Sequence, residues 1–303
     1  MANLNVTFAG VPFKTPVVVA SGTFGFGREY GEMFDLNQLG GICVKGLTLH
    51  PRLGNPPPRI AETPMGILNS VGLQNPGVDR FIKEEMPFLK TLNTNIIANI
   101  SGNTVEEYAE MAEKLSDAGV DIIEVNISCP NVKAGGAAFG TSCDAAASVT
   151  RAVRRISRVP VMVKLTPNVT DIAEIARAVE DAGADALSLI NTLLGMRIDI
   201  TTRRPVLHNN TGGLSGPAVF PVAVRMVWQV RDAVKIPICG MGGIMTGEDA
   251  VEMMLAGADI VSVGTALFQD PLAAIRVTEG IARYLEKMNI ENVTEISGKV
   301  LLN

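Results

Sequence analysis

The residues best suited to chemistry lie in one short segment, Asn126-Ile-Ser-Cys-Pro-Asn131. It follows the apolar run Asp121-Ile-Ile-Glu-Val and precedes the glycine-rich stretch Ala134-Gly-Gly-Ala-Ala-Phe-Gly140. A thiol titrates with a pKa of about 8.5, and each carboxamide offers both a donor and an acceptor, so these groups suit proton exchange and hydrogen bonding. Because α/β enzymes place their chemistry where strands give way to loops, the segment indicates an active site.

Other polar residues interrupt apolar runs at or next to the ends of expected strands. They are Ser21, Lys45, Asn99, Asn126, Lys164 and Asn191. Each has an alternative explanation, because a lysine can reach solvent past the end of a strand and an asparagine can satisfy the backbone of a turn. Their recurrence at equivalent positions favours one shared site.

Three glycine-rich turns predict a phosphate group. Two of them, Gly240-Met-Gly-Gly-Ile244 and Val263-Gly-Thr-Ala266, follow expected strands. The third, Gly212-Gly-Leu-Ser-Gly216, lies earlier in the chain, before the strand expected at 236–240. Any one of them is also explained as a tight turn. Together they favour a phosphate-bearing cofactor, held on backbone N–H groups and a helix N-terminus.

The elements that position these residues follow from a repeated pattern. Three segments each predict a helix end followed by a strand: Ala118-Gly-Val-Asp121, Ala182-Gly-Ala-Asp185 and Ala256-Gly-Ala-Asp259. Each glycine suits the left-handed conformation, with positive φ, that ends a helix. Eight strands are expected, over residues 17–20, 42–45, 95–100, 121–126, 161–165, 186–191, 236–240 and 259–264. Helical periodicity lies between several of them, after capping residues such as Thr104 and Asp171.

Alternating strands and helices predict an α/β protein, a (β/α)8 TIM barrel that forms one domain over residues 1–303. A doubly wound dinucleotide fold is less favoured, since Gly240-Met-Gly-Gly lacks the third glycine of that fingerprint. Residues 4–8 and 12–14 predict a hairpin at the bottom of the barrel. The long connections from Gly46 to Lys83 and from Leu193 to Gly216 are expected as loops that form the walls of the site.

Composition excludes several classes of protein. With 47% hydrophobic residues, 19% charged residues and a net charge of -5, the chain is typical of a globular protein that does not bind nucleic acid. It contains no apolar run long enough for a membrane span and no signal-peptide pattern, so we expect a cytoplasmic protein. The four cysteines include no Cys-x-x-Cys pair, so neither a structural zinc nor an iron–sulfur cluster is expected in this chain.

The chain resembles the dihydroorotate dehydrogenases, which are flavin enzymes of pyrimidine synthesis. The resemblance rests on seven segments in the family's order: 20–25 (ASGTFG), 54–59 (GNPPPR), 69–76 (NSVGLQNP), 126–131 (NISCPN), 164–167 (KLTP), 212–216 (GGLSG) and 240–244 (GMGGI). A cysteine at position 129 resembles class 1 rather than the membrane-associated class 2, which has serine and an N-terminal extension. The stretch from Val44 to Arg52 resembles the NAD-linked subtype 1B, with the fumarate-linked subtype as the alternative.

The resemblance implies a mechanism and a site. Cys129 would remove the C5 proton of dihydroorotate while a hydride passes from C6 to N5 of FMN, and residues 132–141 would close over the substrate. The substrate would be held by Lys45, Asn69, Ser70, Val71, Gly72, Leu73, Asn126, Asn191 and Thr192. FMN would be bound by Ser21, Lys45, Gly46, Asn99, Asn126, Lys164, Ile190, Gly216, Gly242, Gly243, Gly264 and Thr265, with Lys164 beside flavin N1 and O2.

Subtype 1B also implies partners. The catalytic chain would form a homodimer and a heterotetramer with a subunit that carries FAD and a [2Fe-2S] cluster and passes electrons to NAD+. Three alternatives remain at this point: a flavin barrel acting on another dihydropyrimidine, a flavin-free phosphosugar barrel, and a barrel retained only as a binding scaffold.

Overall fold

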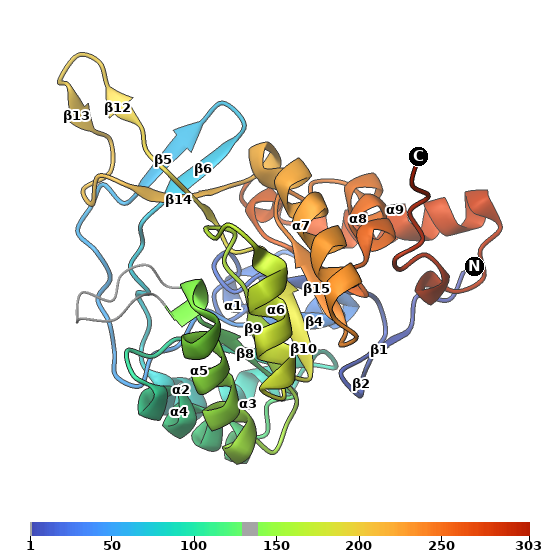
Figure 1. Ribbon diagram of the computed structural model, residues 1–303, viewed down its shortest axis with the longest axis horizontal. Helices are drawn as coiled ribbons and strands as arrows, with labels where there is room; N and C mark the ends of the chain where they lie inside the picture. The colour runs from blue at the N-terminus through green and yellow to red at the C-terminus, as the bar shows by residue number, and fades with distance from the viewer. Residues whose placement is uncertain (1, 129–138) are drawn as a thin grey trace.

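The computed structural model describes residues 2–128 and 139–303 and contains a closed barrel of parallel strands surrounded by helices (Figure 1). The barrel strands are β3 (Val17–Val19), β4 (Gly41–Cys43), β7 (Asn95–Ile100), β8 (Ile122–Asn126), β9 (Val161–Lys164), β10 (Ala186–Leu189), β15 (Ile238–Met241) and β16 (Ile260–Val263). β16 pairs with β3 and closes the barrel. The predicted barrel is confirmed, and each expected strand end lies within two residues of the observed one.

Amphipathic helices cover the outside of the barrel because their apolar faces pack on strands that are buried on both sides. The long helices are α4 (Val105–Ala118), α5 (Cys143–Ile156), α6 (Ile172–Asp181), α7 (Phe220–Ala233), α8 (Gly247–Ala256) and α9 (Ala273–Met288). Thr104 and Asp171 accept hydrogen bonds from backbone N–H groups at the starts of α4 and α6, which confirms the predicted capping positions. None of the helices in the described ranges has the length and apolar character needed to cross a bilayer.

Shorter helices occupy the connections. They are α1 (Arg28–Gly31), α2 (Val78–Glu84) and α3 (Met86–Leu89), with 3-10 turns η1 (Leu36–Gln38), η2 (Phe139–Thr141), η3 (Pro217–Val219), η4 (Thr265–Phe268) and η5 (Val293–Glu295).

The repeated Ala-Gly-x-Asp segments have the same role at three places on the barrel floor, where strands begin. Their glycines have positive φ at the ends of α4, α6 and α8, as predicted. Each aspartate then accepts a hydrogen bond from the first or second N–H of the preceding barrel strand. Asp121 accepts from Ile96 at 2.7 Å, and the equivalent bonds of Asp185 and Asp259 measure 2.8 Å. These carboxylates therefore satisfy strand N–H groups that the sheet leaves unpaired.

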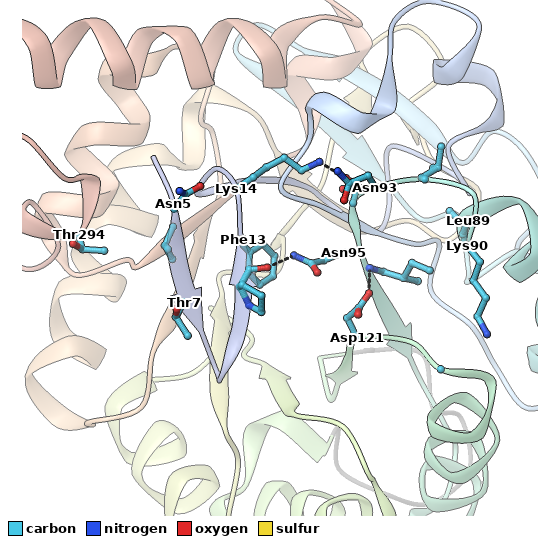
Figure 2. A pocket seen from close by; sticks show the side chains of 16 residues that line it. Asn5, Thr7, Phe13, Lys14, Leu89, Lys90, Asn93, Asn95, Asp121 and Thr294 are labelled. Atoms are coloured by element: carbon cyan, nitrogen blue, oxygen red, sulfur yellow. Dashed lines mark hydrogen bonds between the residues drawn. The ribbon is translucent and has the colours of Figure 1, made fainter. Parts of the chain in front are cut away.

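The predicted N-terminal hairpin is confirmed. β1 (Val6–Phe8) and β2 (Val11–Phe13) pair antiparallel, and the Phe8 and Phe13 rings are buried against the barrel. The Asn95 side chain at the start of β7 donates to the Pro12 carbonyl, so the hairpin lies across the barrel floor. Beside it is a hollow of about 990 Å³, lined by residues that include Lys14, Asn93 and Asn95 (Figure 2).

The two long connections differ from the expected loops. They form a four-stranded antiparallel sheet in the order β11 (Leu193–Gly195), β14 (Gly212–Ser215), β6 (Gly66–Asn69) and β5 (Ile60–Thr63). A further hairpin, β12 (Ile198–Asp199) and β13 (Arg204–Pro205), projects from the body of the molecule (Figure 1). A small apolar cluster of Ala61, Leu68 and Leu207 supports the sheet. Pairing between distant segments is set by tertiary contacts, which explains why local patterns did not reveal these strands.

Candidate active site

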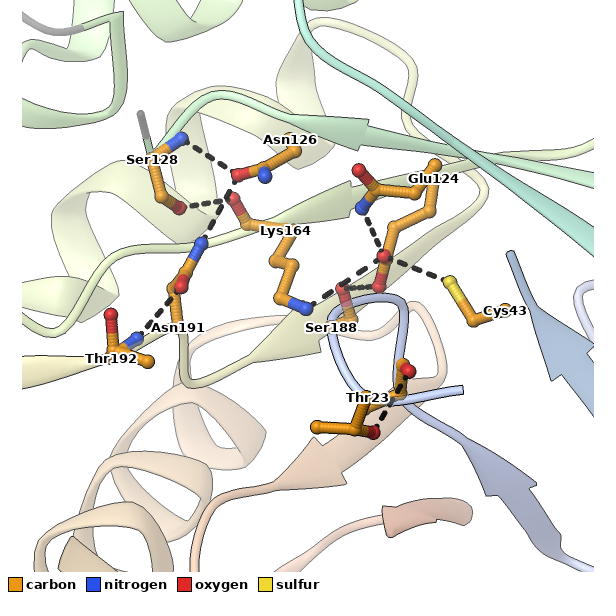
Figure 3. A network of polar contacts seen from close by, with 11 residues as sticks. Thr23, Cys43, Glu124, Asn126, Ser128, Lys164, Ser188, Asn191 and Thr192 are labelled. Carbon is orange, nitrogen blue, oxygen red and sulfur yellow. Dashed lines mark hydrogen bonds and ion pairs between the residues drawn. The ribbon is translucent and has the colours of Figure 1, made fainter. Parts of the chain in front are cut away.

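A buried carboxylate lies inside the barrel near the ends of β7, β8, β9 and β10 (Figure 3). Glu124 of β8 is 1% exposed. Its Oε1 accepts a hydrogen bond from Ser188 at 2.7 Å, and its Oε2 accepts one from the Asn99 amide and one from the Cys43 thiol at 3.2 Å. A buried charge of this kind is tolerated only when it is paired and hydrogen-bonded.

The charge that pairs with Glu124 is Lys164, the last residue of β9. Its Nζ lies 3.8 Å from Glu124 Oε2. Burial raises the pKa of Glu124, but the positive charge of Lys164 and the hydrogen bonds from Ser188, Asn99 and Cys43 outweigh burial and lower it overall. Glu124 is therefore an anion at neutral pH, and Lys164 does not simply extend past the barrel into solvent.

Lys45, just after β4, is a second cation in the same region. Burial lowers its pKa, and repulsion from Arg59 and Lys164 lowers it further. Within residues 2–128 and 139–303, no acidic side chain forms an ion pair with Lys45. We call the end of the barrel where the strands finish the barrel mouth. Two ammonium groups and one carboxylate give this part of the mouth a net positive charge, which suits an anionic ligand.

Carboxamides from the strands on either side of β9 meet beside Lys164. Asn126 Oδ1 accepts hydrogen bonds from Asn191 Nδ2 at 3.1 Å and from the Ser128 backbone at 3.2 Å. The Ser128 hydroxyl donates to the Lys164 carbonyl, and Asn191 Oδ1 accepts from the Thr192 backbone (Figure 3). These bonds fix the orientation of both carboxamides at the C-terminal ends of β8 and β10.

Two buried polar atoms at the mouth have no hydrogen-bond partner among the described residues. They are Asn99 Oδ1 and Ser70 Oγ. Asn99 Oδ1 lies close to Gly46, where an added Cβ would be 2.7 Å from it, so position 46 has no room for a side chain. A third such atom, Ser262 Oγ, lies within β16. Unsatisfied buried polar atoms are costly, and two of them near the strand ends are typical of a ligand site.

The segment from Asn69 to Leu73 approaches this site from the four-stranded sheet. Asn69 Nδ2 donates to the Gly213 carbonyl at 3.4 Å, and an added Cβ at Gly213 would clash with the Thr192 side chain. Leu73 lies next to Gly46, with its Cδ2 3.4 Å from the position of a Cβ there. The sheet thus brings residues 69–73 to the strand ends, although this part of the long connection contains strands as well as loops.

The glycine-rich turns come together on the side of β15 and β16. Gly243 has φ 80°, and a Cβ there would lie 2.8 Å from the Gly216 carbonyl and 2.7 Å from Phe220 Cβ. Ile190 packs against Gly242, and the Thr265 hydroxyl donates to Ser215 at 2.9 Å. Gly216, Gly242, Gly243 and Thr265 therefore form a close-packed backbone cradle, with Gly216 before η3, Gly242 and Gly243 before α8, and Thr265 at the start of η4.

Of the remaining predicted residues, Ser21 and Gly264 lie near the ends of β3 and β16, and Cys129 lies outside the described residues. Ser21 is buried just after β3, and Gly264 lies beside Ala20 and Thr23. Cys129 and most of the predicted closing loop lie outside the described residues, which resume at Phe139 in η2.

Two groups in the site, Glu124 and Ser188, were absent from the residues singled out in the sequence. Ser128 and Arg59 were noted only as members of segments 126–131 and 54–59. Glu124 was recognisable in principle, because it is the one charged residue within the apolar strand 122–126 and lies on the same strand face as Asn126.

Comparisons with known proteins show the family of the chain. A family model described as dihydroorotate dehydrogenase matches residues 3–285. The chain is 60% identical over 298 residues to a protein of Alkaliphilus metalliredigens named "Dihydroorotate dehydrogenase B (NAD(+)), catalytic subunit", covering 98% of this chain and 99% of that protein. A protein of the same name from Geotalea uraniireducens is 57% identical over 300 residues, covering 99% of this chain and 98% of that protein.

A solved structure shares the fold. It is the crystal structure of DHODH from Eimeria tenella in complex with ferulenol, which superposes with a TM-score of 0.81 at 24% sequence identity. The match covers 98% of this chain and 88% of that one.

Proposed function

The chain belongs to the dihydroorotate dehydrogenase family, and from that premise we propose how its residues oxidise dihydroorotate. Its full-length relatives place it with the NAD+-linked B type, as the catalytic subunit, in pyrimidine biosynthesis. The observation that supports the residue assignments is the barrel mouth itself. There, within the described residues, a partly buried cation has no acidic partner and two buried polar atoms have no hydrogen-bond partner.

The substrate chemistry matches the polar groups of the mouth. Dihydroorotate has a carboxylate and a ring of alternating N–H and C=O groups. We assign the carboxylate to the positive region around Lys45, and the ring amides to Asn69, Asn126 and Asn191 with residues 70–73 and Thr192. Carboxamides suit this task because each both donates and accepts, and the Asn126–Asn191 hydrogen bond already fixes which atoms remain for the ligand.

FMN fits the residues present on three grounds. Asn99 Oδ1 is a buried acceptor without a partner among the described residues. The missing side chain at Gly46 lets the Asn99 carboxamide lie against the backbone there, since an added Cβ would be 2.7 Å from Asn99 Oδ1. The cradle of Gly216, Gly242, Gly243 and Thr265 presents backbone where a phosphate would bind.

We therefore propose that Ser21, Lys45, Gly46, Asn99, Asn126 and Lys164 hold the ring and ribityl of FMN. Ile190, Gly216, Gly242, Gly243, Gly264 and Thr265 would hold its phosphate end. When bound, FMN would supply the acceptor for the hydride that leaves C6 of dihydroorotate. The positive charge of Lys164, already held by Glu124, would favour negative charge on the ring next to it.

Cys129 is proposed as the base on the resemblance of segment 126–131 to the family. Its sulfur would take the proton from C5, so that loss of this proton and of the C6 hydride gives the C5–C6 double bond of orotate. Its chain neighbour Ser128 is fixed by hydrogen bonds to Asn126 and to the Lys164 carbonyl. This anchoring supports a defined position for the start of the segment that contains Cys129.

Electron transfer beyond this chain requires a partner. The printed name of the relatives includes "catalytic subunit", which supports a separate subunit for electron transfer. We propose that this subunit holds FAD and a [2Fe-2S] cluster, and that two copies of each chain form a heterotetramer. The isolated chain should then oxidise dihydroorotate with an artificial acceptor but reduce NAD+ poorly, and efficient NAD+ reduction would contradict the arrangement.

The decisive experiment is an anaerobic titration of the purified chain with dihydroorotate while the visible flavin absorption is followed. Bleaching at one equivalent of substrate per bound FMN is the expected result. A yellow protein that dihydrouracil bleaches and dihydroorotate does not would indicate another dihydropyrimidine as substrate. A chain that takes up no FMN would overturn the assignment of the cofactor.

A further inference from the structure

We infer that Glu124 is a positioning residue of this enzyme, which holds Asn99 and Lys164 in the orientation that the flavin site needs and sets the net charge there. The inference rests on the proposed function, because it concerns the FMN site. It adds a residue that lies one layer below the proposed contacts, inside the barrel.

Strand register places Glu124 at the centre of the site's supporting layer. It is paired with Asn99 across β7 and β8, while Asn126 is paired with Lys164 across β8 and β9. Residues 124 and 126 point to the same face of their strand, with 126 nearer the mouth. At 1% exposure, Glu124 acts on a ligand through the side chains that it holds (Figure 3).

The hydrogen bonds of the carboxylate determine which way the Asn99 amide faces. An ionised carboxylate only accepts, so the Asn99 NH2 group must point to Glu124 Oε2. This leaves Asn99 Oδ1 turned away from Glu124, buried and without a partner in the described part of the chain. Glu124 thus fixes Asn99 as an acceptor for a donor group of the ligand. A glutamine at position 124 would remove that constraint, because its amide can also donate.

The same carboxylate sets the charge of the mouth. Lys45 is close enough to Lys164 to be repelled by it, and Glu124 forms an ion pair with Lys164 and with no other cation among the described residues. With Glu124 ionised, the three groups sum to one positive charge, and without it they would sum to two. An extra positive charge beside the flavin ring would favour the reduced, anionic ring over the oxidised ring.

The test uses the FMN-loaded chain and compares E124Q, which removes the charge and keeps the shape, with the wild type. We expect the affinity for reduced FMN to rise about tenfold relative to that for oxidised FMN. This corresponds to a rise of about 30 mV in the reduction potential of the bound FMN, for a two-electron couple. S188A is the matched control, since it removes a hydrogen bond to Glu124 Oε1 and leaves every charge in place. Its potential should stay at the wild-type value.

E124D separates positioning from charge. It keeps the negative charge and shortens its reach by one methylene, so it should weaken FMN retention while the potential stays near that of the wild type. A potential that rises in S188A as much as in E124Q would show that any disturbance of the core has this effect, and would overturn the inference. An E124D chain that retains FMN as the wild type does would overturn the positioning role.

E124Q leaves Lys164 without its buried partner and can fail to fold for that reason. In that case K164M/E124Q, in which neither buried charge is left alone, is compared with the wild type. The double change removes one positive and one negative charge, so the potential should stay near the wild-type value. A clear fall would show that Glu124 does not offset Lys164 and would overturn the inference. A chain that bleaches with dihydroorotate but shows no effect of Glu124 would leave the proposed function intact, whereas failure to bind FMN would overturn the proposed function itself.

Discussion

The polar side chains at the two ends of the barrel differ in whether they have hydrogen-bond partners. On the floor, Asp121, Asp185 and Asp259 each accept a hydrogen bond from a strand N–H, and Asn95 donates to two carbonyls. Lys14 donates to the carbonyls of Asn37 and Asn93. At the mouth, Asn99 Oδ1 and Ser70 Oγ are buried without a partner among the described residues, and the Lys45 ammonium is near other cations.

This difference separates polar residues that stabilise the fold from those that await a ligand. Both ends have asparagines, acidic groups and lysines, and the hollow of about 990 Å³ lies at the floor. Hollow space alone would therefore point to the wrong end. The unsatisfied groups point to the mouth instead, because leaving a buried donor or acceptor unpaired costs free energy that a bound ligand can recover.

The largest expected effect is at the floor, where a change should reduce stability and leave catalysis alone. Phe13 is 1% exposed and packs edge-on against Phe8 beneath the barrel. Phe13→Ala should lower the free energy of unfolding by about 3–5 kcal/mol, because it removes a buried ring and leaves a cavity. Chemical denaturation measures this loss. A large drop in kcat/KM of the folded fraction would show that the two ends are coupled.

The next largest effect is at the mouth, where a change should slow catalysis and leave stability almost unchanged. Cys129→Ala should retain FMN and slow its reduction by dihydroorotate by about 10²-fold or more, which corresponds to about 2.7 kcal/mol of activation free energy. Anaerobic stopped-flow measures the rate, and denaturation should show little change in stability. Cys143→Ala, at the first turn of α5, is the control. A near-normal rate in Cys129→Ala would remove this thiol from the mechanism.

The barrel was predictable because its signals are local. Apolar runs gave all eight strands, and the three Ala-Gly-x-Asp segments gave helix ends with the expected positive φ. In the sheet of β5, β6, β11 and β14, the central pairing joins segments more than 120 residues apart, as in the pairing of Leu68 with Leu214. No local periodicity reports such a pairing. β5 and β6 form a local hairpin, but each strand has only four residues.

The site was predictable to the extent that its residues lie at strand ends. Lys45, Asn99, Asn126, Lys164 and Asn191 share that position, and the structure brings them together. Glu124 was missed because a single charged residue in an apolar strand does not indicate a role until the residues that it contacts are known. Those partners, Ser188, Asn99 and Lys164, come from three other strands and meet only in the closed barrel.

A smaller effect is expected from the aspartates of the floor. Asp121→Ala leaves the Ile96 N–H without its acceptor and should lower the free energy of unfolding by about 2 kcal/mol. Asp121→Asn retains an oxygen acceptor and should lose less than half of that amount. Thermal or chemical denaturation of both variants measures the difference. Equal losses would mean that the charge of Asp121, and not its hydrogen bond, is what the floor requires.

The smallest effect concerns the pH dependence of ligand binding at the mouth. Burial, with repulsion from Arg59 and Lys164, lowers the pKa of Lys45 below its usual 10.5. The ammonium therefore loses its charge at lower pH than a free lysine, and orotate should bind about tenfold more weakly as the pH rises through that lowered pKa. Between the lowered pKa and 10.5 the unfolded chain holds more protons, so Lys45 makes the ligand-free protein more stable as pH rises.

Titration of the FMN-loaded chain with orotate from neutral to alkaline pH measures this weakening. Lys45→Arg is the control, since its guanidinium stays charged throughout the range and any remaining pH dependence belongs to the ligand. We expect weaker binding by Lys45→Arg at neutral pH, because the guanidinium has a different shape, but a flatter dependence on pH. The same alkaline loss in both proteins would mean that Lys45 does not supply the charge that orotate meets, and the contrast between a satisfied floor and an unsatisfied mouth would then rest on Asn99 and Ser70 alone.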